Sequence, residues 1–252
     1  MLNQSQIAEA AALLVKARED RKPLAEFPEN CRPASLEDGY AVQDAVASAL
    51  KAQIGGYKAI APKEGAPTRG PLYANMIRAT PARYPAAAVR PCGVEGEVAF
   101  RYTRDLPPRA TDYTRAEVTT AVEACAAIEV VSTRFADHSK KSVFERLADN
   151  NLNGGFVHAA PIADWQKLDL GNLRVVLEVN GEVVDDHTGG HPTGDPLGVA
   201  VALANLLRTG PGIKEGQFCT CGTYTGLRFL EPGDVCVVRF DGLGEAQVGF
   251  VP

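Results

Sequence analysis

The chain lacks any long apolar segment. Its longest apolar stretches cover residues 10–15 and 197–204, far short of the roughly 18 or more residues that a membrane-spanning helix needs. The first ten residues, MLNQSQIAEA, show no basic region followed by an apolar block, so we expect no secretory signal there. These absences predict a cytoplasmic protein with no membrane partner.

A basic stripe is also missing. Lys and Arg total 26 against 31 Asp and Glu, which gives a formal net charge of −5. Binding to nucleic acid or to an anionic membrane surface requires clustered positive charge, and the nearest approach to a cluster is Lys140-Lys141. We therefore expect neither nucleic acid nor an anionic membrane as a partner.

Cysteines are few and widely spaced. The 252 residues contain 6 cysteines and no CxxC motif, and a chain of this length needs no disulfide framework. Cys219 and Cys221 share a strand face, but two thiols are too few for structural zinc. We expect reduced and mostly buried thiols.

The hydrophobic pattern predicts helices first and strands afterwards. Apolar residues at helical spacing indicate a helix that ends near Asp20, and a second helix that begins at Ser35, three residues before Asp38. The Gly- and Pro-rich residues 62–71 indicate a loop. Strands are expected over 94–102, 124–135, 218–224, 235–240 and 245–251, a hairpin over 174–186 with Asn180-Gly181 at its turn, and helices over 115–122 and 195–209.

This order of elements predicts an α+β fold around a curved sheet or barrel-like roll. We expect a helical N-terminal region, residues 1–54, packed on a core formed by residues 55–252. The core is expected to be a single structural unit, since we find no repeat, linker or low-complexity block in it.

Three glutamates carry the strongest chemical signal. Glu95 and Glu97 lie two residues apart in a predicted strand, so their side chains point to the same face. Glu129 stands alone in the apolar strand AAIEVV, where a buried carboxylate without a partner costs several kcal/mol. A divalent cation with all-oxygen ligands, Mg²⁺ or Mn²⁺, would offset the repulsion among the three. Alternatively, Glu95 and Glu97 belong to a solvated strand face.

At these residues the chain resembles a known family. The segments VEGEVAFRYTRDLPPR, AIEVVSTRFAD, LADNNLNGGFVHAAP, CGTYTGLRFLEPGD and DGLGEAQVGF occur in this order, as in the fumarylacetoacetate hydrolase superfamily. The similarity is closest to its branch of 2-hydroxypenta-2,4-dienoate hydratases, 2-oxohept-4-ene-1,7-dioate hydratases and 4-oxalocrotonate decarboxylases. It runs over about four fifths of the chain.

The resemblance implies a fumarylacetoacetase-like mixed β-roll and a divalent metal held by Glu95, Glu97 and Glu129. It implies a lysine beside the metal in a Gly-Tyr-Lys motif, which here is Lys58, and a Gly-Thr-Tyr-Thr turn that helps to hold the substrate carboxylate. In that turn the substrate-binding positions are Thr223 and Thr225. Members of the family are usually oligomeric, so we expect a homo-oligomer.

Other positions are less clear from the sequence. Arg134 could bind a distal carboxylate of the substrate, because a guanidinium suits that bidentate contact, although a surface role is the alternative. Asn75 occupies the position of the aspartate in the family's Asp-Met pair, which makes it a candidate catalytic residue beside Lys58. An amide cannot exchange a proton, but it can orient water or substrate by hydrogen bonds. His187 and His191 flank a Gly-Gly turn and could form a second metal site, but histidines in such turns are usually solvated.

The expected activity is that of a metal-dependent lyase. It would hydrate a 2-hydroxy-2,4-dienoate (2-oxopent-4-enoate-like) to a 4-hydroxy-2-oxo acid, as in meta-cleavage catabolism of aromatic hydrocarbons. One alternative is decarboxylation of a 4-oxalocrotonate-like 2-oxo diacid, which would use the same metal-stabilised electron sink. Another is a catalytically impaired binder of 2-oxo acids, for which Asn75 is the only support. The C–C bond hydrolases of the superfamily use a lid histidine near the N-terminus, whereas no histidine precedes residue 138 here.

Overall fold

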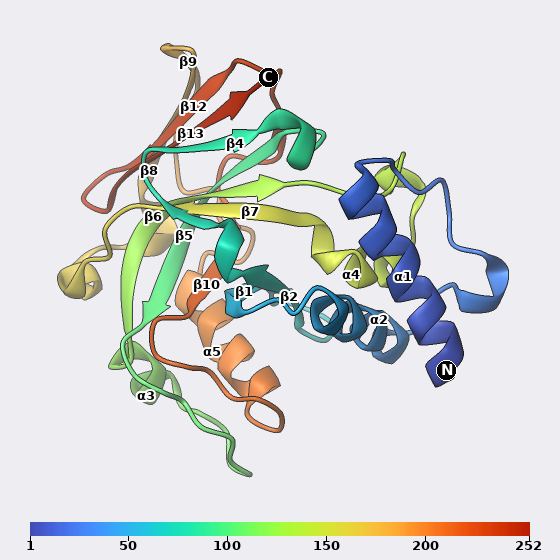
Figure 1. Cartoon of the computed structure of the whole chain (residues 1–252). Helices are drawn as coiled ribbons and strands as arrows, with labels where there is room; N and C mark the ends of the chain where they lie inside the picture. Colours follow the sequence, from blue (N-terminus) through green and yellow to red (C-terminus); the bar gives the residue numbers. More distant parts are fainter.

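Two curved sheets and a group of N-terminal helices make up the molecule (Figure 1). A computed structural model describes the whole chain, Met1–Pro252. The helices are α1 (Gln4–Asp20), α2 (Leu36–Ala49), α3 (Arg115–Thr119), α4 (Val143–Ala148) and α5 (Pro196–Leu207). The strands are β1 (Ile54–Ile60), β2 (Thr68–Tyr73), β3 (Ile77–Ala79), β4 (Ala82–Pro85), β5 (Gly93–Tyr102), β6 (Val122–Val131), β7 (Asn153–His158), β8 (Arg174–Val179), β9 (Glu182–Thr188), β10 (Phe218–Thr223), β11 (Arg228–Phe229), β12 (Val235–Phe240) and β13 (Gly244–Val251).

The larger sheet has eight strands in the order β2-β1-β10-β5-β6-β7-β3, with the short β11 also paired to β5. The smaller sheet has five strands in the order β4-β13-β12-β8-β9. Strands β12 and β13 contact β6, so the two sheets pack against each other. The expected α+β roll is therefore confirmed, and no helix in it is long and apolar enough to cross a bilayer.

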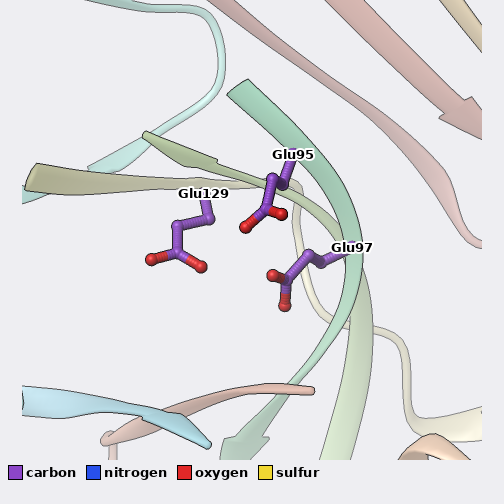
Figure 2. Close-up of side chains that lie close together, drawn as sticks. All are labelled: Glu95, Glu97 and Glu129. Atoms are coloured by element: carbon purple, nitrogen blue, oxygen red, sulfur yellow. The ribbon is translucent and has the colours of Figure 1, made fainter. Parts of the chain in front are cut away.

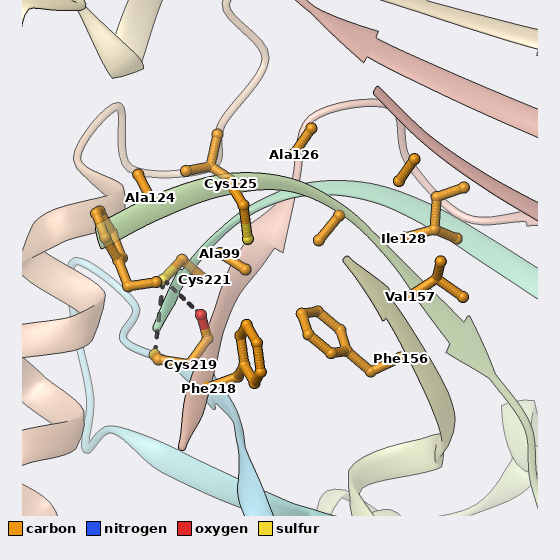
Figure 3. Close-up of a cluster of buried hydrophobic side chains, with 14 of the residues drawn as sticks. Ala99, Ala124, Cys125, Ala126, Ile128, Phe156, Val157, Phe218, Cys219 and Cys221 are labelled. Carbon is orange, nitrogen blue, oxygen red and sulfur yellow. Dashed lines mark hydrogen bonds between the residues drawn. The ribbon is translucent and has the colours of Figure 1, made fainter. Parts of the chain in front are cut away.

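The main core fills the space around the central strands β5 and β6. A cluster of 51 buried apolar residues extends through both sheets and α5. Figure 3 shows part of it, where Phe156 and Phe218 face each other with ring centroids 5.3 Å apart. All six cysteines are free and buried, as expected, and the Sγ atoms of Cys219 and Cys221 lie 3.6 Å apart.

The N-terminal helices have a separate, smaller core of nine buried apolar residues. Ser35 caps α2 by accepting a hydrogen bond from the main-chain N–H of Asp38. The Asp38 carboxylate does not bond back to the N–H of Ser35, as the residue three positions after the cap does in a capping box. Instead it accepts hydrogen bonds from the main-chain N–H groups of Leu2 (2.7 Å) and Ala34 (3.2 Å), so it joins the start of the chain to α2.

Several predicted boundaries are wrong. The helix expected over 115–122 ends at Thr119, and Val122 already belongs to β6. Residues 62–71 were expected to be a loop, yet Thr68–Tyr73 form β2. Pro71 is compatible with this strand because β2 is the edge of its sheet, where a missing N–H leaves no neighbouring strand unpaired. The strand expected to reach residue 135 ends at Val131, and the chain then turns so that Arg134 enters a buried ion pair.

Candidate metal centre

Strand register brings the three glutamates together. In the antiparallel β5–β6 pair, Glu95 lies directly opposite Glu129, and Glu97 lies opposite Ala127. Because paired residues project from the same face of a sheet, all three carboxylates gather on one side. Their nearest oxygens lie within 4.8 Å of one another (Figure 2).

Gly96, which lies between Glu95 and Glu97 in β5, has no room for a side chain. A Cβ on Gly96 would lie 2.7 Å from a methyl group of Val238 in the second sheet and 3.0 Å from one of Thr225. The Thr225 hydroxyl accepts a 2.9 Å hydrogen bond from the N–H of Gly96. This close packing fixes the strand that carries Glu95 and Glu97.

Lys58, from β1, is the positive charge nearest to the carboxylates. Its Nζ lies 3.0 Å from Oε2 of Glu129 and 3.6 Å from Oε2 of Glu95. Burial alone would lower the pKa of Lys58, but the carboxylates of Glu129, Glu95 and Glu97 outweigh burial and raise that pKa. One ammonium therefore faces three carboxylates, and the ionised group keeps two net negative charges.

The carboxylates are poorly neutralised by the chain itself. Glu97 is only 1% exposed and Glu129 is fully buried. Burial, followed by repulsion from Glu129 and Glu95, raises the pKa of Glu97 well above its usual range. Burial likewise raises the pKa of Glu95, although Lys58 opposes the shift.

Hydrogen bonds orient two of the carboxylates and leave one oxygen free. Oε2 of Glu97 accepts from the main-chain N–H of Gly222 (2.9 Å), and Oε1 of Glu129 accepts from Nδ2 of Asn153 (2.9 Å). Oε1 of Glu97 is buried and has no hydrogen-bond partner. Buried carboxylates of this kind are satisfied by a cation, and all-oxygen donors suit a hard divalent ion. The three glutamates thus fit the expected metal.

A cavity of about 260 Å³ opens beside this group. Lys58, Glu95, Glu97 and Thr223 line it, as does His191, which the sequence placed in a solvated turn. The hydroxyl of Thr223 is buried and has no partner in the chain. The cavity thus combines negative charge, one ammonium and a free hydroxyl.

Two expected site residues lie outside the cavity. Arg134 is 6% exposed, and its guanidinium donates to Asp149 and to the main-chain carbonyl of Asn153, away from the cavity beside the glutamates. Asn75 is exposed in the turn after β2 and lines a different hollow. Gly70 is the β2 partner of Lys58, whereas Asn75 lies beyond the end of that strand, in the 3₁₀ turn Ala74–Met76.

The expected substrate contact of Thr225 is also not evident, because its hydroxyl is engaged with the main chain of Gly96 and Gly226. His187 is hydrogen-bonded to Asp185 and to the carbonyl of Tyr224, which gives it a structural place between β9 and the Gly-Thr-Tyr-Thr turn.

Sequence reasoning did not assign the groups that hold the ligands. Asn153 lies in the segment LADNNLNGGFVHAAP, which contributed only to the family resemblance, and its contact with Glu129 depends on the β6–β7 pairing. Gly222 acts through its main chain, for which no side-chain pattern exists. Its φ of +111° favours glycine, and this is the one local signal.

The comparisons with known proteins agree with this architecture. The family model for the fumarylacetoacetate (FAA) hydrolase C-terminal domain matches residues 44–251. A 2-keto-4-pentenoate hydratase of Paraburkholderia xenovorans (strain LB400) is 27% identical over 264 residues, which cover 99% of this chain and 96% of the relative.

Decarboxylases are similar as well. A 4-oxalocrotonate decarboxylase of Pseudomonas putida is 35% identical over 125 residues, 49% of this chain and 47% of the relative, so this match spans about half of that protein. The solved structure of 4-oxalocrotonate decarboxylase from Pseudomonas putida G7, complexed with calcium and acetate, has a TM-score of 0.84 and 25% identity and covers 100% of this chain and 99% of the other. With a family model matched over most of its length and this fold, the chain belongs to the fumarylacetoacetate hydrolase family.

Proposed function

We propose that the chain is a divalent-metal-dependent hydro-lyase that hydrates a 2-hydroxy-2,4-dienoate, such as 2-hydroxypenta-2,4-dienoate, to a 4-hydroxy-2-oxo acid. The observation that carries the proposal is the buried group of Glu95, Glu97 and Glu129 with Lys58 beside a cavity. The full-length similarity to a 2-keto-4-pentenoate hydratase supports the choice of substrate class.

Each group has a distinct task in this reaction. The three carboxylates would hold Mg²⁺ or Mn²⁺, which when bound supplies a Lewis acid for the carboxylate and 2-oxo oxygens of the substrate. Lys58 brings a positive charge toward the enolate oxygen, where negative charge develops. The unpaired hydroxyl of Thr223 donates to the substrate carboxylate. Asn75 receives no task, because it lies in another hollow.

Decarboxylation of a 4-oxalocrotonate-like acid is the second candidate. A decarboxylase is 35% identical over half of the chain, and the reaction needs the same stabilisation of negative charge on the 2-oxo group. The two reactions differ in what leaves or adds at the far carbons, which this cluster of charges does not select.

The test is a spectrophotometric assay of the EDTA-treated full chain with 2-hydroxypenta-2,4-dienoate, before and after Mg²⁺ or Mn²⁺ is added. We expect metal-dependent loss of the dienol absorbance. Glu97→Gln should abolish it, because the variant loses a ligand. Glu123→Gln is the matched control, since Glu123 lies in β6 without an ion pair, and it should keep the activity.

A parallel assay follows CO₂ release from 4-oxalocrotonate. Turnover of this acid but not of the dienoate would select the second candidate. A protein that binds Mn²⁺ and oxalate yet turns over neither acid would contradict both candidates and leave a 2-oxo acid binder.

A further inference from the structure

A second charged hollow lies where the end of α1 meets the roll. Its charged lining consists of Arg18, Arg21, Arg90 and Arg134, with no acidic residue among the residues that form it. We name these four residues the arginine pocket. Four guanidinium groups around one hollow are unexpected in a chain whose net charge is −5.

Three of the four arginines have no counter-charge in the chain. Arg134 is paired with Asp149. The side chains of Arg18, Arg21 and Arg90 form no ion pair. Elsewhere in the chain, most arginine side chains that form hydrogen bonds donate to a carboxylate. Arg109, Arg115, Arg174, Arg208 and Arg239 show the usual arrangement. Other arginines, Arg83 among them, also form no ion pair, but Arg18, Arg21 and Arg90 lie around one hollow.

Arg18 is the most enclosed of the three. Its guanidinium lies over the ring of Tyr73, 5.4 Å from the ring centroid. Burial, together with the neighbouring Arg134, lowers the pKa of Arg18 to about 10, so the group stays charged at neutral pH. Tyr73 is 5% exposed, and its hydroxyl is buried without a hydrogen-bond partner.

The arginine pocket itself has a volume of about 40 Å³, and it adjoins a larger hollow that Arg90 and Arg134 do not line. The larger hollow shares Arg18 and Arg21 with the arginine pocket, adds Lys51 and Tyr73, and has a volume of about 530 Å³ with Glu19 as its one acidic residue. Small-molecule sites commonly have volumes of about 300–1,000 Å³. Guanidinium groups bind carboxylate and phosphate oxygens through paired hydrogen bonds, and a bound anion would relieve the repulsion among the arginines.

This hollow is separate from the metal centre. In β2, Tyr73 and Gly70 project to opposite faces, because they are three residues apart in one strand. Gly70 pairs with Lys58 of the metal centre. Tyr73, and Arg18 over its ring, therefore lie on the opposite face of the β1–β2 pair from the metal centre. A substrate bound beside the glutamates does not fill the hollow.

We propose that the arginine pocket is a second binding site, specific for a small oxyanion, a carboxylate or a phosphate. The site does not depend on the metal, and its ligand is a molecule other than the substrate bound beside the glutamates.

The experiment is calorimetric titration of the EDTA-treated full chain with inorganic phosphate, and separately with succinate, at constant ionic strength. Arg18→Gln and Arg90→Gln are compared with wild type. Arg90 is exposed and its side chain has no partner, so its variant should fold normally. Arg83→Gln in β4 is the matched control, since Arg83 is also exposed.

We expect binding to wild type and to Arg83→Gln, and at least about tenfold weaker binding to the other two variants, as loss of a charge-assisted hydrogen bond predicts. The stronger of the two probes identifies the class, phosphate or carboxylate. Absence of binding to wild type, or equal affinity in wild type and Arg90→Gln, would overturn the proposal. Neither result bears on the activity assay, which depends on the glutamates.

Discussion

Asn153 supports the metal centre from outside the ligand set. Its amide donates to Oε1 of Glu129, while Lys58 approaches the other oxygen. The main-chain carbonyl of Asn153 in turn accepts from Arg134. Glu129 is therefore oriented by a chain of contacts that begins at a buried ion pair, and the ligand has one defined position.

We predict that Asn153→Ala weakens Mn²⁺ binding by about 10- to 100-fold, as is typical when a residue that orients a metal ligand is removed. Calorimetric titration of the metal-free protein with Mn²⁺ measures this. Asn172→Ala is the control, because Asn172 is exposed and contacts only Asp169 through its side chain. Unchanged affinity in Asn153→Ala would show that Glu129 needs no support.

Individual site residues were predictable where one strand holds them. The spacing of Glu95 and Glu97 fixes their common face, and Glu129 is conspicuous in an apolar strand. That Glu129 lies opposite Glu95 depends on register, which one sequence does not reveal. The resemblance placed Asn75 at the site, and the chemistry of its guanidinium suggested Arg134. An ion pair engages Arg134, and Asn75 lines another hollow beyond the end of β2.

Among the elements, α2 depends on the carboxylate of Asp38, which joins the helix to the start of the chain and to the segment before α2 through hydrogen bonds. Burial alone would raise the pKa of Asp38, but hydrogen bonds from the main chain of Leu2 and Ala34 outweigh burial and lower it. Asp38 in its ionised form therefore stabilises the folded state. Since its folded pKa lies below the unfolded value of about 3.9, this stabilisation is complete above that value and disappears as the pH falls through the folded pKa.

We predict that Asp38→Asn lowers the free energy of unfolding by about 2 kcal/mol at pH 7, because hydrogen bonds to a charged acceptor are weakened. The difference from wild type should narrow as the pH falls below about 4. Urea unfolding over a pH series measures both effects. Glu37→Gln removes the same charge from the same helical turn, and it should have little effect. If the difference in unfolding free energy between wild type and Asp38→Asn grew as the pH fell, the assigned role of Asp38 would be wrong.

Elements with a local signal were predicted well. Asn180-Gly181 forms the turn of the β8–β9 hairpin, and Asp195 caps α5 with Pro196 at its first position. The strand β2 was missed because Gly70 and Pro71 are loop-forming residues in isolation. Pairing with β1 overrides that tendency, and this pairing is a tertiary effect.

At the scale of the molecule, two apolar cores differ greatly in size. The main cluster has 51 buried residues and the N-terminal cluster has nine. Phe27 is fully buried in the smaller one, where its ring meets Phe135 edge-on with centroids 5.3 Å apart. Since local stability follows buried apolar contact, we propose that residues 1–54 open before the roll does.

We predict that native-state hydrogen exchange finds a lower opening free energy for α1 and α2 than for β5 and β6. Phe27→Ala should lower it further for the helices, by about 3 kcal/mol, and change the central strands much less. Equal protection in helices and strands, falling equally in the variant, would show that the chain opens as one cooperative unit.

The pairing of strands that are far apart in the chain could not be predicted from the sequence pattern. Strand β1 pairs in parallel with β10, so Gly56 lies opposite Phe218 across most of the chain. Helical and strand periodicity describe single segments, and neither specifies which distant segment becomes the neighbour. The order of elements predicted the α+β class with a curved sheet or roll, and the family resemblance specified a fumarylacetoacetase-like mixed β-roll.

The six buried thiols can report local opening of the chain, because a thiol reacts with an alkylating reagent only when it becomes exposed. Burial raises the pKa of Cys125 and Cys236 to about 12, and Cys219 and Cys221 lie in the same core (Figure 3). Cys31 belongs to the N-terminal cluster. Alkylation of Cys31 alone would therefore show that the N-terminal helices have opened. Alkylation of the other five cysteines would show that the roll itself has unfolded.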